Sequence, residues 1–381
     1  MTFSHNKNQQ ALCDDMIRFA QEQLTRDLVR RDREQVFLDE NWQACASKGV
    51  LGLYIPTEYG GQGHSIANSV RMMEAIGFGC PDNGLTLALN GQMWAVQEPI
   101  LKFGTEQQKR KYLPRLINGE LKGAHGMTEP ESGSNAFDLN TTATKTDGGY
   151  LLNGNKTYIG LGPVAGLILV FATVDASKGR WGISAFIVEA DSAGVTLGNA
   201  VGKLGLRTGP MGDITFTDTF VPEENLLGNI GSGSSIFNSS MDFERSFIFA
   251  SHVGSMARQL EQTVEFAKSR SISGSPIGKH QAVSHRIAEM KVRLETSRLH
   301  MYRAAELLDQ GKSIPLEAAT TKLVISEAFV QNSLDAIRIH GGKGYLSEEG
   351  VERNLRDALG GVIYSGTSDI QRNLIAGLLG L

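Results

Sequence analysis

Leu167-Ile168-Leu169-Val170-Phe171-Ala172, LILVFA, decides the fold, because it breaks the helical pattern of the residues before it. A second apolar run follows at 183–189, ISAFIVE, and the stretch ITFTDTFV at 214–221 alternates apolar and polar residues. The turn signals Asp147-Gly148-Gly149 and Asn153-Gly154 precede these runs. Short β-type segments separated by turns indicate strands. We therefore predict an antiparallel β domain in the middle of the chain.

On both sides of this domain, apolar residues recur every three or four positions, which is the spacing of an amphipathic helix. The pattern covers residues 12–24 before the domain and residues 253–267 and 287–308 after it. Ser313 and Pro315 are expected to begin a further helix, as its N-cap and first-turn proline.

The predicted fold is therefore mainly α with a central β domain. An N-terminal helical domain over residues 1–120 precedes the antiparallel β domain over 121–226. A C-terminal helical bundle over 227–381 completes the chain.

Composition narrows the classes of partner. The net charge is only −4, and no block of like charges offers a surface for nucleic acid or an anionic membrane. The first residues lack the features of a secretory signal, and no apolar run approaches the ~20 residues of a membrane span. We therefore expect a cytoplasmic protein without nucleic-acid or membrane partners. The three cysteines match no disulfide framework or metal site, so we expect buried or incidental thiols.

Seven short motifs follow one another along the chain. They are TEPESGSN at 128–135, NGNKTYIG at 153–160, KLGLRTGPMGDITFTDTFVP at 203–222, MDFERSF at 241–247, RxxxGxxIxxxQ from Arg270 to Gln281, HGGKGY at 340–345 and IYSGTSDIQR at 363–372. Each is weak alone, since glycine and serine clusters are common in plain loops. In this order and spacing they resemble the acyl-CoA dehydrogenase family over nearly the whole chain.

This resemblance implies the family's fold, with a C-terminal four-helix bundle, and an FAD held between the β domain and the C-terminal helices. A neighbouring subunit of a homo-oligomer, a dimer of dimers, would reach the adenine half. The positions that match FAD contacts are Thr128, Ser134, Tyr158, Arg270, Gln281, Arg338, Gly341, Gly342, Thr367 and Asp369. No metal is implied.

Simpler interpretations exist for some of these positions. Gly341 and Gly342 could end a helix, Tyr158 could be a half-buried strand aromatic, and Arg270 could be a solvated charge. Three positions also depart from the family pattern. Gly160 replaces a hydroxyl residue that bonds flavin N5, Ser273 replaces a phenylalanine, and Arg338 replaces a glutamine near the FAD.

The departure that bears most on catalysis is Ser365, which stands where the commonest family members carry a glutamate base. Isovaleryl- and long-chain acyl-CoA dehydrogenases take their base from the helix that corresponds to MDFERSF, directly before an arginine. By that resemblance Glu244 is the base, while Arg245, Tyr364 and Ser365 lie at the substrate. The alternative for Glu244 is a surface acid in the first turn of a helix.

The narrower resemblance is to L-prolyl-S-peptidyl carrier protein dehydrogenases, which implies α,β-dehydrogenation of an acyl or aminoacyl thioester on a carrier protein in a biosynthetic pathway. Three alternatives remain: a short- or branched-chain acyl-CoA dehydrogenase, a non-catalytic FAD-binding assembly partner, and an enzyme that oxidises a hydroxyl-bearing carrier-bound unit, as related biosynthetic enzymes do. An electron-transfer flavoprotein or oxygen would reoxidise the flavin.

Overall fold

The computed structural model describes residues 7–381, so the first six residues of the predicted N-terminal domain lie outside it. Helices form the first part of the described chain. They are α1 (Lys7–Gln23), α2 (Leu28–Glu34), α3 (Asp39–Ser47), α4 (Ile66–Gly79), α5 (Asn83–Gly91), α6 (Glu98–Phe103) and α7 (Glu106–Ile117), with a π-helical segment, Gln92–Gln97, between α5 and α6. A capping box begins α7, because Thr105 and Gln108 exchange side-chain to backbone hydrogen bonds.

The middle part is one sheet. Its strands are β1 (Gly123–Gly126), β2 (Thr142–Thr146), β3 (Gly149–Gly160), β4 (Leu167–Thr173), β5 (Ile183–Glu189), β6 (Val195–Leu197), β7 (Met211–Pro222) and β8 (Leu226–Leu227). The order is β6-β7-β3-β2-β4-β5-β8, with β1 also paired to β4. The strands predicted at 167–172, 183–189 and 214–221 correspond to β4, β5 and β7.

Two details correct the predicted β domain. The pairings of β1 with β4 and of β2 with β4 are parallel, whereas the other pairings in this sheet are antiparallel. Asn153-Gly154 is not a turn but lies inside β3, where the pairing with β7 shifts register between Leu152 and Gly154. A glycine inside a strand commonly marks such an irregularity.

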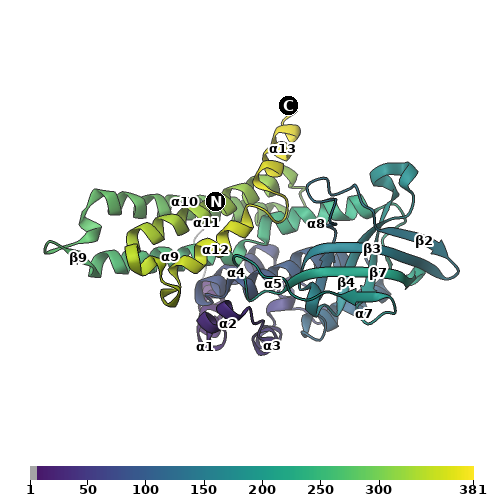
Figure 1. The fold of residues 1–381 in the computed structure, drawn as a ribbon, viewed down its shortest axis with the longest axis horizontal. Helices are drawn as coiled ribbons and strands as arrows, with labels where there is room; N and C mark the ends of the chain where they lie inside the picture. Colours follow the sequence, from purple (N-terminus) through teal and green to yellow (C-terminus); the bar gives the residue numbers. More distant parts are fainter. Residues whose placement is uncertain (1–6) are drawn as a thin grey trace.

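The C-terminal part is a helical bundle. Its elements are α8 (Gly233–Phe247), α9 (Ala250–Ser269), the short strands β9 (Ser271–Ile272) and β10 (Ser275–Pro276), α10 (Gln281–Asp309), α11 (Pro315–His340), α12 (Val351–Gly361) and α13 (Ser368–Leu378). Figure 1 shows α9, α10 and α11 side by side, with the β9 hairpin at the end of the bundle away from the sheet. Pro315 occupies the first turn of α11 as predicted, but the N-cap is Ile314 rather than Ser313.

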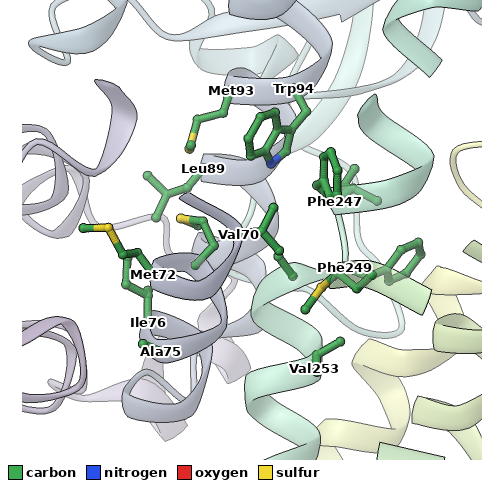
Figure 2. Packing of buried hydrophobic residues seen from close by; sticks show 14 of the residues in the cluster. Val70, Met72, Ala75, Ile76, Leu89, Met93, Trp94, Phe247, Phe249 and Val253 are labelled. Carbon is green, nitrogen blue, oxygen red and sulfur yellow. The ribbon is translucent and has the colours of Figure 1, made fainter. Parts of the chain in front are cut away.

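One large core joins the two helical parts. Val70 and Ile76 of α4, Trp94 of the π-helical segment and Val253 of α9 are fully buried in it, and Figure 2 shows them converging. At Gly77 an added Cβ would lie 1.8 Å from the backbone oxygen of Ser251, so α4 and α9 pack with almost no space between them. This core fixes α8, which runs between the bundle and the sheet (Figure 1).

The predicted mainly α fold with a central β domain is confirmed. The three cysteines are buried, as expected. Across residues 7–381, no helix combines the length and apolar character needed to cross a membrane.

Candidate active site at the end of α8

Glu244 lies in the last turn of α8 and is 8% exposed. Its Oε1 accepts a hydrogen bond from the Ser365 hydroxyl at 2.5 Å, across 121 residues of sequence. The other carboxylate oxygen, Oε2, is buried and has no hydrogen-bond partner among residues 7–381. Glu244 is therefore not a surface acid in a first helical turn, and the structure excludes that alternative.

Burial raises the pKa of Glu244, against the opposing effects of the Ser365 hydrogen bond and the nearby Arg245 charge. The C-terminal end of a helix also disfavours a negative charge. A carboxylate with a raised pKa and one oxygen free of hydrogen bonds is a stronger proton acceptor than an ordinary glutamate. This arrangement is suited to general base catalysis.

Ser365 is held in position by its own backbone. It adopts a left-handed conformation with φ +55°, which is uncommon outside glycine. The Gln371 side chain, fully buried, donates from Nε2 to the backbone oxygens of Ser365 and Gly366 at 3.2 and 3.0 Å. Thr367 caps α13 by accepting from the backbone N–H of Ile370. The sequence analysis did not identify Gln371, because its role depends on the turn geometry.

Two more predicted residues lie beside this pair. Tyr364 stacks on Phe249 with ring centroids 5.4 Å apart, and its hydroxyl is buried without a partner among the described residues. Burial, with the Asp357 and Glu244 charges, raises the pKa of Tyr364 well above its usual value. The Nε of Arg245 is also buried and unpartnered in the described chain. The Arg245 Nε–H and the Tyr364 hydroxyl can each donate a hydrogen bond to a polar substrate or water.

The flavin residues predicted in the β domain do not lie in regular, half-buried strand positions. Tyr158 is 68% exposed and has φ +57°, at the register shift of β3 between Lys156 and Ile159. It is therefore not a half-buried strand aromatic. Ser134 is exposed on its loop, and the backbone oxygen of Thr128 accepts from the N–H of Thr157 at 2.9 Å. The loop of Thr128 thus adjoins the Tyr158 segment.

A buried ion pair supports this loop, and the sequence analysis missed it. Lys156 is fully buried and donates from Nζ to Glu129 Oε1 at 2.7 Å and to the Met127 backbone oxygen at 3.1 Å. Glu129 also accepts from the N–H groups of Asn140 and Thr141, at 2.6 and 3.0 Å. Both ends of the loop are therefore tied to one carboxylate.

Arg270, Gln281 and Gly341 lie at the end of the bundle that carries the β9 hairpin (Figure 1), whereas Thr367 and Asp369 begin α13, directly after Ser365. Arg270 follows α9, Gln281 begins α10, and both are exposed. Gly341 has φ +59° and ends α11, as the simpler interpretation of it expected.

Three further positions have local roles. Arg338, more than half exposed, forms an ion pair with Asp335 at 3.5 Å. Asp369 is exposed and forms an ion pair with Arg372 at 2.8 Å. Ser273 has φ +50° in the β9–β10 turn.

Comparison with known proteins agrees with this architecture. The family models of the acyl-CoA dehydrogenase N-terminal, middle and C-terminal domains match residues 6–120, 124–219 and 231–379. The chain is 42% identical over 377 residues to an L-prolyl-[peptidyl-carrier protein] dehydrogenase of Pseudomonas fluorescens, covering 99% of each chain.

Two solved structures are also similar. The prolyl acyl carrier protein oxidase AnaB has a TM-score of 0.98 and 43% identity, over 99% of this chain and 100% of that one. PigA, solved with FAD and proline, has a TM-score of 0.97 and 37% identity over the whole of both chains. By sequence and by structure, the chain belongs to the acyl-CoA dehydrogenase family.

Proposed function

We propose that the chain is a cytoplasmic, FAD-dependent oxidoreductase that forms a double bond between the α and β carbons of an acyl or aminoacyl thioester. We further propose that a carrier protein presents the substrate, in a biosynthetic pathway. The observation that carries the proposal is the buried Glu244 carboxylate, with one oxygen held by Ser365 and the other free. The similar L-prolyl-[peptidyl-carrier protein] dehydrogenase and prolyl acyl carrier protein oxidase support the choice of substrate.

In this reaction the free Oε2 of Glu244 accepts the α-proton of the thioester. Ser365 holds Oε1, so the carboxylate keeps its orientation as the proton arrives. FAD, when bound, supplies the acceptor for the β-hydrogen as hydride. Backbone groups around Ser365 are proposed to face the thioester carbonyl oxygen, where preorganised donors stabilise developing negative charge. Arg245 and Tyr364 are proposed to line the acyl end.

The residues present fit an FAD. Tyr158 projects an exposed aromatic ring beside Gly160, where an added Cβ would meet no atom within 4 Å. Gly341 and Gly342 are equally open. Such open glycines permit close approach by a planar ring or a phosphate. We propose that Thr128, Ser134, Tyr158, Arg270, Gln281, Arg338, Gly341, Gly342, Thr367 and Asp369 hold the cofactor.

This set requires more than one copy of the chain. Tyr158 belongs to β3 of the sheet and Arg270 directly precedes the β9 hairpin, and Figure 1 shows the sheet and this hairpin toward opposite ends of the molecule. Because these two elements are far apart in one chain, we propose that a second copy supplies one of the two groups to each dinucleotide. Exposed apolar side chains at the end of the projecting helix α13 and in the β9 hairpin support this, including Leu378 at 48% and Ile272 at 58% exposed. We propose a homo-oligomer, a dimer of dimers.

Anaerobic flavin bleaching tests the proposed function. The purified holoenzyme is mixed with prolyl and small acyl groups, each attached either to a carrier protein or to CoA. We expect bleaching by a carrier-bound substrate, and its loss in Glu244→Gln. Equal bleaching by the same group on CoA would favour an acyl-CoA dehydrogenase. Absence of bleaching with every thioester would favour a non-catalytic FAD-binding protein.

The reoxidation partner is tested in the same preparation. We propose that either oxygen or an electron-transfer flavoprotein accepts the electrons. Admitting air to the bleached enzyme restores the flavin absorbance rapidly in the first case. In the second case it recovers only when an electron-transfer flavoprotein is added.

A further inference from the structure

A small cavity of about 120 Å³ lies between α2, the 203–208 loop and α12, outside the proposed active site. None of the residues proposed for FAD or the thioester lines it. Its walls carry four arginines and a single acid, and the lining residues are Val29, Asp32, Arg33, Arg207, Ser347, Arg353 and Arg356. The walls are thus strongly cationic.

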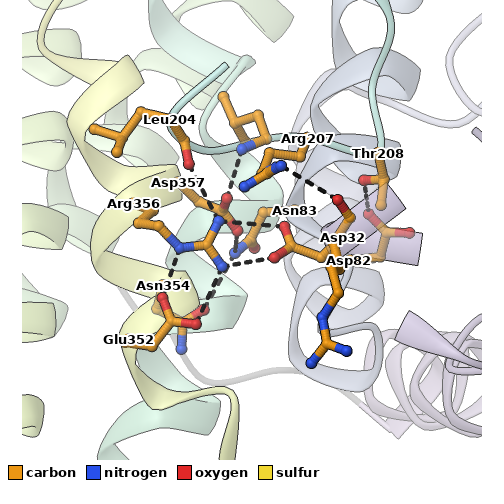
Figure 3. A network of polar contacts seen from close by, with 12 residues as sticks. Asp32, Asp82, Asn83, Leu204, Arg207, Thr208, Glu352, Asn354, Arg356 and Asp357 are labelled. Atoms are coloured by element: carbon orange, nitrogen blue, oxygen red, sulfur yellow. Dashed lines mark hydrogen bonds and ion pairs between the residues drawn. The ribbon is translucent and has the colours of Figure 1, made fainter. Parts of the chain in front are cut away.

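One of the arginines is fully compensated. Arg356 donates to both oxygens of Asp32 and to both oxygens of Glu352, at 2.6 to 3.3 Å, and to the backbone oxygen of Leu204 at 3.1 Å. Figure 3 shows its guanidinium between the two acids, with Arg207 alongside. Arg33 is mostly exposed and lies 3.5 Å from Glu348. Arg356 therefore needs no further partner, whereas the exposed Arg33 remains accessible at the rim.

Arg207 and Arg353 differ from them. Within the described part of the chain, neither has an acid within 4 Å, and the Nε–H of each is buried without an acceptor. Arg353 is nine-tenths buried, with 9% exposure. Asp357 is nearby, but its oxygens accept from the Leu206 N–H and the Asn83 amide instead. Arg207 also donates from Nη2 to the Arg33 backbone oxygen at 3.2 Å. A buried charged donor without an acceptor is costly, and the cavity has one such Nε–H on each of these two arginines.

We propose that this cavity binds a phosphoryl group. Two uncompensated guanidinium charges match the charge of an ionised phosphate, and arginine donors suit its several oxygens. The exposed Ser347 hydroxyl and Arg33 at the rim add donors that a phosphate monoester can use. The ligand is therefore inorganic phosphate or a small phosphate monoester, at a site separate from the thioester.

Isothermal titration calorimetry of the FAD-loaded oligomer in phosphate-free buffer tests this proposal, with inorganic phosphate and AMP as separate probes. We expect saturable phosphate binding that sulfate competes away. Arg207→Gln and Arg353→Gln should each weaken it about tenfold or more, because each removes a charge-assisted hydrogen bond. The control is Arg303→Gln, which removes an arginine charge of α10 outside the cavity. Arg303 is half exposed and lies 3.6 Å from Glu317, much as Arg33 lies 3.5 Å from Glu348.

The probes also identify the source of the phosphoryl group. Equal affinity for phosphate and AMP indicates a site for the phosphoryl group alone, whereas tighter binding of AMP indicates a nucleotide. If Arg353→Gln fails to fold, Arg207→Gln and the exposed Arg33→Gln carry the same test. No saturable binding of either probe, or equal weakening by Arg303→Gln, overturns the proposal. Because the readout is binding, its failure is distinct from failure of the dehydrogenation test.

Discussion

Glu129 and Glu244 are both buried acids, but the protein surrounds them in opposite ways. Glu129 has the Lys156 charge and two backbone N–H groups around it, so both of its oxygens have partners. Burial opposes its ionisation, yet these partners outweigh burial and lower the pKa of Glu129. Glu244 has one hydroxyl partner, its other oxygen is buried without a hydrogen bond from the described residues, and burial raises its pKa. A fully satisfied carboxylate supports structure, whereas an unsatisfied one is available for proton transfer.

The largest expected effect separates the two acids by activity. Glu244→Gln removes the proton acceptor while keeping its shape, so we expect a loss of roughly 10²- to 10⁴-fold in kcat. Flavin content should stay unchanged. Single-turnover bleaching with a carrier-bound thioester measures the effect. Activity close to that of the wild type would show that Glu244 is not the base.

Glu129→Gln should mainly lower folding stability, whereas Glu244→Gln mainly lowers activity. Glu129→Gln leaves the Lys156 charge buried without its acid, which costs about 3–5 kcal/mol of folding stability. Thermal or urea unfolding of the holoenzyme measures the loss, and Glu129→Gln with Lys156→Met should recover part of it. A single variant as stable as the wild type would contradict the supporting role of the pair.

The pH dependence of stability sharpens the contrast between the acids. The lowered pKa of Glu129 contributes stability that is present above its unfolded pKa and lost as the pH falls through its folded pKa. Glu244 has a raised folded pKa, so stability is lost as the pH rises from its unfolded toward its folded pKa. Glu244→Gln should therefore be more stable than the wild type above this window. Unfolding midpoints of both proteins, measured across pH, test this. A Glu244→Gln variant less stable than the wild type at neutral pH would refute it.

A smaller effect is expected from Ser365→Gly, which removes the hydroxyl and suits the positive φ. The lost hydrogen bond had lowered the pKa of Glu244, so the acidic limb of kcat/KM should move to higher pH. We expect roughly tenfold lower kcat/KM at the acidic end. An unmoved limb would mean that Ser365 does not tune the base.

The smallest effect is expected from Gly160→Thr, four residues after Lys156 in β3. The side chain has room, because an added Cβ at Gly160 meets no atom within 4 Å. It restores a hydroxyl where the family usually bonds flavin N5, so we expect altered flavin reoxidation with little change in stability. Stopped-flow reoxidation measures it. Unchanged kinetics would show that Gly160 does not set flavin reactivity.

Residue order and spacing predicted much of this molecule but not its supporting contacts. Glu244 could be proposed as the base because the family resemblance marks both positions, and a serine stands at 365 where most members carry a glutamate. The Glu129–Lys156 pair could not, since it joins a loop to a strand 27 residues away and a fully buried lysine is not expected from its residue type. Gln371 was missed for a similar reason: its partners are backbone atoms of a tight turn.

The 2.5 Å contact between Ser365 and Glu244 has a consequence for how the base could move during evolution. A glutamate at position 365 would place a second carboxyl group against Glu244. Two carboxylates that close cannot both ionise and instead share one proton. An ancestor that carried both acids would thus retain one ionised acceptor at neutral pH, and either acid could then be lost without an inactive intermediate.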